Sequence, residues 1–486
     1  MTHNIVSIAE RKTNLQLLNK LLNTEKEAIS NALFQDLHKP TFESLYLEIK
    51  QVQHDIQYHL DNLENWTSQQ IFINPLRYLT LTLTGYGKTY VESKPRGKSL
   101  IIGAWNYPIN LSLQPLVGSI SAGNETLVVF PALDYTPKTS TLMIALFNKY
   151  FKNNKYISAK IGGKENIAKI LQTKWDFIFY TGSSKVGKII YEEAAKQLTP
   201  VVLELGGKSP CIIDKQSNIN LLIKRILWGK LTNCGQTCIS PDYFLVDEKF
   251  GDEFVKILIN TVKDFYGKDI KKSPDYARII NTQAFKRLTT IIENDKRFIE
   301  YGGKSDFNQL FVEPTIINFK HNKEAFLNSF SMQDEIFGPI IPIFYFKDIL
   351  ETKAVINKYP EPLVAYLFTS KWKELDDIKS GSIVVNDTLI QMSSPLPFGG
   401  IGNSGIGKYH GKHSFDIFSY QRSKLIRYKW GEIPARFPPY NVRWKQFIIK
   451  ISQTIFSLKH FEKIYRLGKK ILFMYIVYVL IAYHLK

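Results

Sequence analysis

The sequence reads Trp175-Asp-Phe-Ile-Phe-Tyr-Thr-Gly-Ser-Ser-Lys-Val-Gly-Lys188, and a second apolar run, Val201-Val-Leu-Glu-Leu205, follows it. The first six residues predict a buried strand, and the small residues after Tyr180 predict a turn into a helix over 185–197. A strand, a helix and a second strand in this order are typical of a βαβ unit, whose strands are parallel.

The same alternation extends to both sides of this unit. Before it, apolar strands are predicted at 99–102 and 126–130, and helices at 137–150 and 164–172. After it, short apolar runs predict strands at 210–213, 243–246, 340–346, 364–369 and 382–385. Strands that alternate with helices favour two α/β halves, with catalysis in the cleft between them.

The N-terminal segments follow other periods. Leucines recur three to four positions apart from Leu15 onward, which predicts helices across 13–66. The run Leu79-Thr-Leu-Thr-Leu-Thr84 alternates as a half-buried strand does, and Gly85-Tyr-Gly87 predicts the turn that closes it.

Length and cysteine content limit the kind of protein. A chain of 486 residues is long enough for two or three domains. It has three cysteines, Cys211, Cys234 and Cys238, and its first residues lack the apolar segment of a signal peptide. Free thiols in a reducing, cytoplasmic compartment are therefore expected. A metal site is not expected, because no histidine lies near the cysteine pair in sequence.

The charge is strongly basic, with a net +19 from 63 Lys and Arg against 44 Asp and Glu. Thirteen basic residues lie between Arg422 and Lys470, where Glu432 and Glu462 oppose them. This excess precedes an apolar C-terminal segment, which favours a membrane surface as a partner. Nucleic acid is not expected, since the sequence has no zinc-finger, RRM or KH signature.

The candidate nucleophile lies in Asn233-Cys-Gly-Gln-Thr-Cys-Ile-Ser-Pro241. A thiolate attacks carbonyl carbon readily, and a glycine-containing turn leaves the sulfur and nearby N–H groups accessible. The alternative is that Cys234 and Cys238, four positions apart, share a buried helix face.

Two further motifs carry groups that suit such a thiol. Glu204 begins Glu204-Leu-Gly-Gly-Lys-Ser-Pro210 at the end of a predicted strand, where a carboxylate can take a proton from water. Asn106 lies in Gly103-Ala-Trp-Asn-Tyr-Pro108 after another strand, and its amide can donate to a developing oxyanion. Both residues also suit turns, where they would make structural hydrogen bonds.

Three glycine-containing motifs complete the set. Tyr180–Lys188 runs into a helix start, whose free N–H groups suit a pyrophosphate, although its Gly-x4-Gly spacing differs from the dinucleotide fingerprint. Glu335-Ile-Phe-Gly-Pro339 is the second. The third is Pro397-Phe-Gly-Gly-Ile-Gly-Asn-Ser-Gly-Ile-Gly-Lys-Tyr-His-Gly-Lys-His-Ser-Phe415, whose glycines imply close backbone approach or an interdomain loop.

Taken in order, these six motifs resemble the series of the aldehyde dehydrogenase superfamily, over about residues 10–425. The members of the series are Trp-Asn-Tyr-Pro, Thr-Gly-Ser, Glu-Leu-Gly-Gly-Lys, Gly-Gln-Thr-Cys, Glu-Ile-Phe-Gly-Pro and Pro-Phe-Gly-Gly. The Asn-Tyr-Pro form and the ending Gly407-Lys-Tyr-His-Gly-Lys-His-Ser-Phe415 look like the class 3 branch, which includes fatty aldehyde dehydrogenases.

The resemblance implies a role for each site residue. Cys238 would attack the aldehyde to form a thiohemiacetal, with the oxyanion held by the amide of Asn106 and the backbone N–H of Cys238. Hydride would pass to NAD or NADP, and Glu204 would activate the water that hydrolyses the resulting thioester. The residues expected to hold the cofactor are Gly182, Ser183, Val186 and Gly187 at the pyrophosphate, and Glu335 and Phe337 at the nicotinamide ribose and ring. Packing is the expected role of Cys234 and Cys211, and His410 and His413 are expected to be structural or dimer-contact residues.

The resemblance also implies the domain organisation. The expected fold is α/β and aldehyde dehydrogenase-like, with two Rossmann-type domains, a small bridging and oligomerisation β-segment, and a helical C-terminal tail; a homodimer is expected. The N-terminal helices and dinucleotide-binding domain would occupy 1–205, with about 77–96 contributing to the bridging sheet. The catalytic domain would occupy 206–390, the bridging segment 391–425 and the membrane-associating tail 426–486.

One stretch departs from the family pattern. After Ala-Gly-Asn the family usually has a Lys-Pro-Ser/Ala-Glu element, whose Lys and Glu bind the adenosine ribose, whereas Phe130 and Leu133 stand here. Hydrogen bonds to charged groups are worth about 1.5–3 kcal/mol each. We therefore predict weaker or differently selected cofactor binding.

The C-terminal residues 471–485 form an apolar stretch behind Lys469 and Lys470. A helix of this length would reach about 22 Å, against a hydrocarbon core of about 30 Å. Membrane association through this tail is expected, the alternative being that it packs across a dimer partner.

The resemblance therefore implies an NAD(P)-dependent oxidation of medium- or long-chain apolar aldehydes to carboxylic acids. A semialdehyde-specific or acylating relative is the alternative within the same chemistry. A membrane-tethered pseudoenzyme is the alternative outside it, suggested by Phe130 and Leu133.

Overall fold

The computed structural model describes residues 6–71, 87–215, 218–393, 395–429 and 436–447. The chain divides into two compact units, one within Met1–Ser68 and Ser93–Tyr420, the other within Gln69–Glu92 and Gln421–Lys486. The first unit contains both large sheets and the candidate site.

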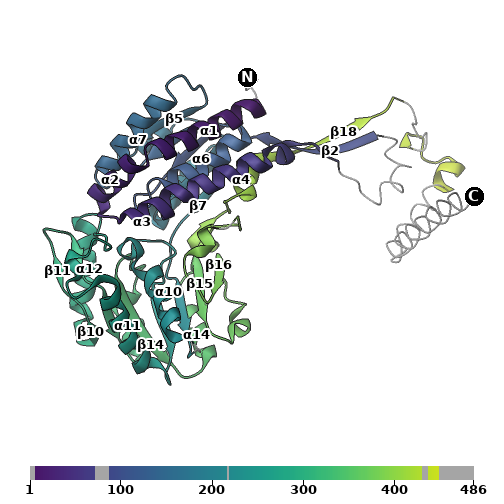
Figure 1. The fold of residues 1–486 in the computed structure, drawn as a ribbon. Helices are drawn as coiled ribbons and strands as arrows, with labels where there is room; N and C mark the ends of the chain where they lie inside the picture. The colour runs from purple at the N-terminus through teal and green to yellow at the C-terminus, as the bar shows by residue number, and fades with distance from the viewer. Residues whose placement is uncertain (1–5, 72–86, 216–217, 394, 430–435, 448–486) are drawn as a thin grey trace, which may run out of the picture. The chain divides into compact units, whose positions relative to one another are not determined.

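Helices fill the N-terminal segment, as the leucine spacing predicted (Figure 1). They are α1 (Ile8–Thr24), α2 (Lys26–Leu37), α3 (Thr41–Glu43), the π-helical turn η1 (Ser44–Ile49) and α4 (Lys50–Thr67). Ser7 caps α1 by accepting from the N–H of Glu10, whose carboxylate in turn accepts from the N–H of Ser7. His38 adopts a left-handed φ of 53°, which ends α2 and turns the chain toward α3.

The first sheet has six strands in the order β17-β7-β6-β3-β4-β5. Five are parallel, and β17 pairs antiparallel with β7. The strands are β3 (Lys98–Ile102), β4 (Glu125–Phe130), β5 (Ile157–Ile161), β6 (Phe177–Thr181), β7 (Val201–Glu204) and β17 (Gly405–Ile406). The connecting helices are α6 (Asn110–Ala122), α7 (Pro137–Tyr150), α8 (Lys164–Leu171) and α9 (Ser184–Ala195).

Alternation along these strands separates two cores. Ile101, Val128 and Phe179 pack into the large core that also contains residues of α1, α4, α6 and α7. Their neighbours in the strands, such as Leu100 and Ile178, belong to a second core with residues of α8 and α9. Both faces of the sheet are therefore covered, as a parallel sheet requires.

The second sheet has seven strands in the order β10-β13-β14-β9-β8-β15-β16. All neighbours are parallel except β10 with β13. The strands are β8 (Pro210–Ile213), β9 (Tyr243–Asp247), β10 (Ile299–Tyr301), β13 (Thr315–Asn318), β14 (Ile340–Phe346), β15 (Val364–Phe368) and β16 (Ser382–Val385). The helices between them are α10 (Ile219–Leu231), α11 (Gly251–Tyr266), α12 (Thr282–Asn294), α13 (Lys323–Asn328) and α14 (Ile349–Ile356). All five strands predicted in this half are present, and β10 and β13 are additions.

The remaining elements are short. A hairpin pairs β11 (Ser305–Asp306) with β12 (Phe311–Val312), and α15 spans Lys412–Ile417. A three-stranded sheet has the order β1-β2-β18, from β1 (Gln70–Ile71), β2 (Gly87–Pro95) and β18 (Ser419–Arg427). The α/β class with two Rossmann-type sheets is confirmed, whereas the exact domain boundaries stay a prediction.

Two predicted segments lie outside the described residues. They are the strand at 79–84 and the apolar tail at 471–485. Within the part of the chain that the structure describes, no helix combines the length and apolar character needed to cross a bilayer.

Candidate active site

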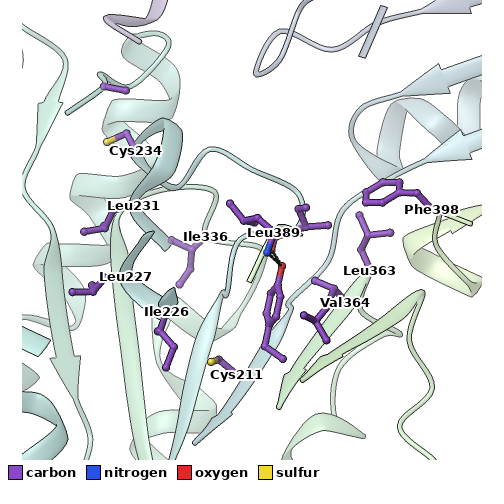
Figure 2. Packing of buried hydrophobic residues seen from close by; sticks show 14 of the residues in the cluster. Cys211, Ile226, Leu227, Leu231, Cys234, Ile336, Leu363, Val364, Leu389 and Phe398 are labelled. Atoms are coloured by element: carbon purple, nitrogen blue, oxygen red, sulfur yellow. Dashed lines mark hydrogen bonds between the residues drawn. The ribbon is translucent and has the colours of Figure 1, made fainter. Parts of the chain in front are cut away.

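Cys238 is the accessible member of the three cysteines. Cys211 and Cys234 are 0% exposed, whereas Cys238 is half-buried. Cys211 lies in β8, and Figure 2 shows both of these sulfurs among apolar side chains. Cys234 sits in a 3-10 turn after α10 (η2, Thr232–Gly235) with a left-handed φ of 56°, so the two motif cysteines do not share a helix face. The packing predicted for Cys211 and Cys234 is confirmed.

A cavity opens over Cys238. Glu204, the last residue of β7, lines the same cavity and is 3% exposed. Both of its carboxylate oxygens are buried and have no hydrogen-bond partner among the described residues. Burial raises the pKa of this carboxyl well above its ordinary value, and the charge of Lys408 opposes the shift. In its ionised form, which populates above the raised pKa, this carboxylate can accept a proton from a molecule in the cavity.

Burial also raises the pKa of the Cys238 thiol, and the nearby carboxylates of Glu335 and Glu204 add to the shift. The thiol is therefore protonated at neutral pH in this state of the protein. Attack on a carbonyl requires removal of that proton. The reactivity of Cys238 therefore depends on the nearby carboxyl groups of Glu204 and Glu335.

The side chain of Asn106 is held against the segment that carries Cys238. Its Nδ2 donates to the main-chain oxygen of Gln236 at 3.1 Å, and the residue is 3% exposed. The hydroxyls of Tyr107 and Thr237 lie 2.8 Å apart and make a second link between the same two segments. One N–H of the Asn106 amide is thus occupied by Gln236, and the other N–H would have to serve an oxyanion.

The predicted pyrophosphate residues lie at the start of α9. Ser183 caps this helix by accepting from the N–H of Val186 at 3.4 Å. Val186 is 38% exposed, and Gly187 is packed so closely that a Cβ would lie 2.7 Å from Leu205 Cδ2. Gly182 lies between the end of β6 and this helix. A helix N-terminus lined by small residues fits a dinucleotide pyrophosphate.

The predicted nicotinamide-side residues come from the other half of the unit. The half-buried Glu335 lies against Gly206, where any Cβ would collide with its carboxylate. Burial and the charge of Asp242 raise the pKa of Glu335 to about 8. Phe337 has a left-handed φ of 46°, and its ring centroid lies 5.5 Å from that of Trp105. Together with the start of α9, Glu335 and Phe337 would hold a nicotinamide dinucleotide.

A sequence model described as the aldehyde dehydrogenase family matches residues 3–424. The chain belongs to the aldehyde dehydrogenase family. It is 40% identical over 463 residues to aldehyde dehydrogenase family 3 member A2 of Pongo abelii, covering 93% of this chain and 90% of the relative. It is 38% identical over 449 residues to the 4,4'-diaponeurosporen-aldehyde dehydrogenase of Staphylococcus aureus, covering 91% of this chain and 95% of the relative.

Solved structures agree with this assignment. The substrate-bound Staphylococcus aureus AldH superposes with a TM-score of 0.86 at 37% identity, covering 92% of this chain and 96% of that one. A glyceraldehyde-3-phosphate dehydrogenase from Methanocaldococcus jannaschii, complexed with NADP, shares the fold with a TM-score of 0.74 at 22% identity, covering 87% and 90%. The protein is an NAD(P)-dependent aldehyde dehydrogenase that oxidises aldehydes.

The two residues predicted to replace the family's charged pair at the adenosine ribose differ in their exposure. Phe130 is 0% exposed and packs edge-to-face on Phe147 of α7, with centroids 5.4 Å apart. Leu133 is 49% exposed. Phe130 therefore contributes to the core instead of facing a ligand, and neither side chain offers a charge to a ribose hydroxyl.

Three residues at the site, His410, Lys39 and Glu48, were not predicted to be part of it. His410 lines the cavity and stacks on Phe398 at 4.9 Å between centroids, although it was expected to be structural or at a dimer contact. Lys39 and Glu48, from the N-terminal helices, contact the Asn106 segment. Lys39 and Glu48 lie outside the six sequence motifs. Their contacts join segments more than 60 positions apart, so no local sequence pattern indicates them.

Proposed function

We propose that this enzyme oxidises medium- and long-chain apolar aldehydes to carboxylic acids, with NAD or NADP as the hydride acceptor. The observation that carries the proposal is the lining of the cavity that contains Cys238 and Glu204. The apolar and aromatic side chains of this lining are Tyr107, Leu111, Ile239, Met392, Phe398 and Tyr409. None of the lining residues is Lys or Arg, so the described wall offers no fixed cation to a charged substrate.

The reaction would begin at the sulfur of Cys238. Once deprotonated, Sγ attacks the carbonyl carbon, a C–S bond forms, and the carbonyl oxygen becomes an oxyanion. The second N–H of Asn106 and the backbone N–H of Cys238 stabilise this charge; one such donor is worth about 3–4 kcal/mol. NAD or NADP, which the start of α9 with Glu335 and Phe337 would hold, would supply the hydride acceptor. Loss of hydride from the former carbonyl carbon would leave a thioester on Cys238.

Glu204 would complete the cycle. Its carboxylate takes a proton from water, the resulting hydroxide attacks the thioester carbon, and the C–S bond breaks to release the acid and the thiolate. The raised pKa of Glu204 suits this step, since a stronger base removes a proton from water more readily. A usable base at this position supports hydrolysis over transfer of the acyl group to coenzyme A, and the complete set of groups argues against a pseudoenzyme.

The experiment that tests the proposal compares substrates. Hexanal and hexadecanal are expected to give higher kcat/KM values than succinic semialdehyde, with the free acid as the product. A preference for the charged semialdehyde would overturn the substrate class. Formation of an acyl-coenzyme A when coenzyme A is present would overturn the hydrolytic mechanism.

Replacement of Asn106 by alanine is expected to lower kcat about 10²- to 10³-fold, because one oxyanion donor is lost. KM for hexanal is expected to change little, since the amide binds the charge that develops during the reaction. Steady-state kinetics measures both constants, and Asn65→Ala, an exposed position in α4, is a matched control. A KM effect without a kcat effect would contradict the assigned role.

Cofactor affinity is expected to be weaker than in relatives that have the Lys and Glu, or shifted toward NADP. Phe130 and Leu133 leave the adenosine ribose without charged partners, and a 2′-phosphate without a repelling carboxylate. Titration of the enzyme with NAD and with NADP by calorimetry measures this difference. Restoring the family residue with Leu133→Glu is expected to favour NAD, and an unchanged ratio would contradict the assignment.

We propose that the protein is a homodimer. Among the described residues, β18 lies at the edge of its sheet, and its apolar residues Tyr420, Leu425 and Ile426 are 43–61% exposed. A strand at the edge of a sheet is a site for pairing with another chain. The rat relative is named a dimeric NADP-preferring aldehyde dehydrogenase, at 38% identity. A single monomeric species in sedimentation analysis would refute the dimer.

We propose that this enzyme is cytoplasmic and that its basic and apolar C-terminal tail holds it at a membrane surface. The proposal rests on the sequence of 426–486, in which Lys469 and Lys470 precede the apolar stretch. The full chain is expected to sediment with membranes in a cell fractionation, and a truncation at 445 is expected to stay in the supernatant. Both proteins remaining in the supernatant would refute it.

A further inference from the structure

A buried ion pair lies behind the oxyanion donor. Lys39, in the turn between α2 and α3, and Glu48, in the π-helical turn η1, are both 0% exposed. Their Nζ and Oε1 atoms are 2.5 Å apart. Removing two charges from water is costly, and a pair of apolar residues often serves stability equally well. The pair therefore needs an explanation other than stability.

The contacts of the pair all lead to the segment that carries Asn106. Lys39 Nζ donates to the main-chain oxygen of Asn106 at 2.8 Å and stands 4.1 Å from the ring centroid of Tyr107. Glu48 Oε2 accepts from the N–H groups of Ile109 and Asn110 at 2.8 and 3.3 Å. The cation and the carboxylate thus hold the backbone at both ends of residues 106–110.

The nucleophile segment is tied to the same carbonyl. Asn233 Nδ2 donates to the oxygen of Asn106 at 2.9 Å and to the oxygen of Gln236 at 3.1 Å. Gln236 is also the acceptor for the Asn106 side chain. The backbone oxygen that Lys39 holds is therefore part of the network that fixes Asn106 relative to Cys238.

We infer that Lys39, with Glu48 as its counter-ion, is a positioning residue that fixes the Asn106 amide for oxyanion binding over Cys238. The inference rests on the proposed function, because it assumes that an oxyanion forms there. Lys39 acts through the main chain of Asn106 and touches neither the substrate nor the cofactor. Glu48 orients the ammonium group and holds the next peptide units in place.

The expected result is a selective loss of turnover. Lys39→Met is expected to lower kcat about 10- to 100-fold, the range that a small displacement of a catalytic group produces. KM for hexanal is expected to stay within about threefold, because Lys39 is not among the residues that line the cavity. Lys149→Met, which removes the cation of the exposed 2.7 Å ion pair with Glu25, is the matched control and is expected to leave kcat unchanged.

Lys39→Met leaves Glu48 buried without its counter-ion, so a second variant is needed in case the first does not fold. The double variant Lys39→Met/Glu48→Gln removes both charges, while the Gln oxygen can still accept from the N–H of Ile109. It is expected to show the same loss of kcat with a circular dichroism spectrum like that of the wild type. A wild-type kcat in the folded double variant would overturn the inference.

A double-mutant cycle separates positioning from a general structural role. In an Asn106→Ala background, Lys39→Met is expected to reduce the residual kcat by less than about threefold, since the amide it positions is absent. An undiminished 10- to 100-fold loss in that background would show that Lys39 acts elsewhere and would overturn the inference. Failure of the wild type to oxidise hexanal would instead refute the proposed function, so the two failures are distinguishable.

Discussion

Replacing Cys238 with alanine is expected to abolish aldehyde oxidation, lowering kcat by about 10⁴-fold or more. The chemistry requires a covalent bond between sulfur and the aldehyde carbon, and removal of a nucleophile typically costs this much or more. Absorbance at 340 nm measures the reduced cofactor directly. The variant is expected to bind NAD or NADP like the wild type, because Cys238 lines the aldehyde cavity.

The other two cysteines are natural controls for this experiment. Cys211 and Cys234 are fully buried, and replacing either with alanine removes one sulfur from the core. Each variant is expected to lose some stability, typically about 1–3 kcal/mol, and to keep its oxidation activity when folded. A folded Cys234→Ala variant without activity, together with an active Cys238→Ala variant, would reverse the assignment of the nucleophile.

The architecture was predictable where short-range patterns decide it. Each predicted strand of the two large sheets is present, since runs such as Ile340–Phe346 are apolar throughout and buried on both faces. β13 was not predicted, because four residues, Thr315–Asn318, are too few to show a period. Its place in the sheet depends on pairing with β14, a contact between segments apart in sequence.

In the candidate site too, the residues in sequence motifs were predictable, and the residues placed by long-range contacts were not. Cys238, Glu204 and Asn106 stand in motifs whose order indicates their roles, and Cys238 and Glu204 line one cavity. The Lys39–Glu48 pair was not predicted, because a lysine at the end of a helix usually faces solvent. Tertiary contacts with a segment 67 residues away make it a buried group, and sequence patterns do not report such contacts.

Replacing Glu204 with glutamine is expected to lower kcat about 10²- to 10⁴-fold, the usual contribution of a general base. The amide has a similar size but cannot take a proton from water, so the thioester on Cys238 would form and then persist. Rapid mixing with hexanal and cofactor is therefore expected to give one equivalent of reduced cofactor in a burst, followed by slow turnover. Glu27→Gln, an exposed position in α2, is the control and is expected to behave like the wild type.

The pH dependence tests the same residue independently. Because burial raises the pKa of Glu204, its basic form populates above the raised value, and the wild-type kcat is expected to increase with pH through that range. The variant is expected to lose this increase. A pH profile that is unchanged in Glu204→Gln would assign the titration to another group, such as Glu335 with its pKa of about 8.

Stability is expected to change in the opposite sense to activity. A carboxyl with a raised pKa in the folded state binds its proton more tightly there than in the unfolded chain. The free energy of unfolding of the wild type therefore falls as the pH rises from the ordinary glutamate pKa toward the raised one. Glutamine carries no charge to bury, so the difference in Tm between Glu204→Gln and the wild type is expected to grow from pH 5 to pH 8. A constant difference over that range would mean that Glu204 does not titrate as a buried, unpaired base.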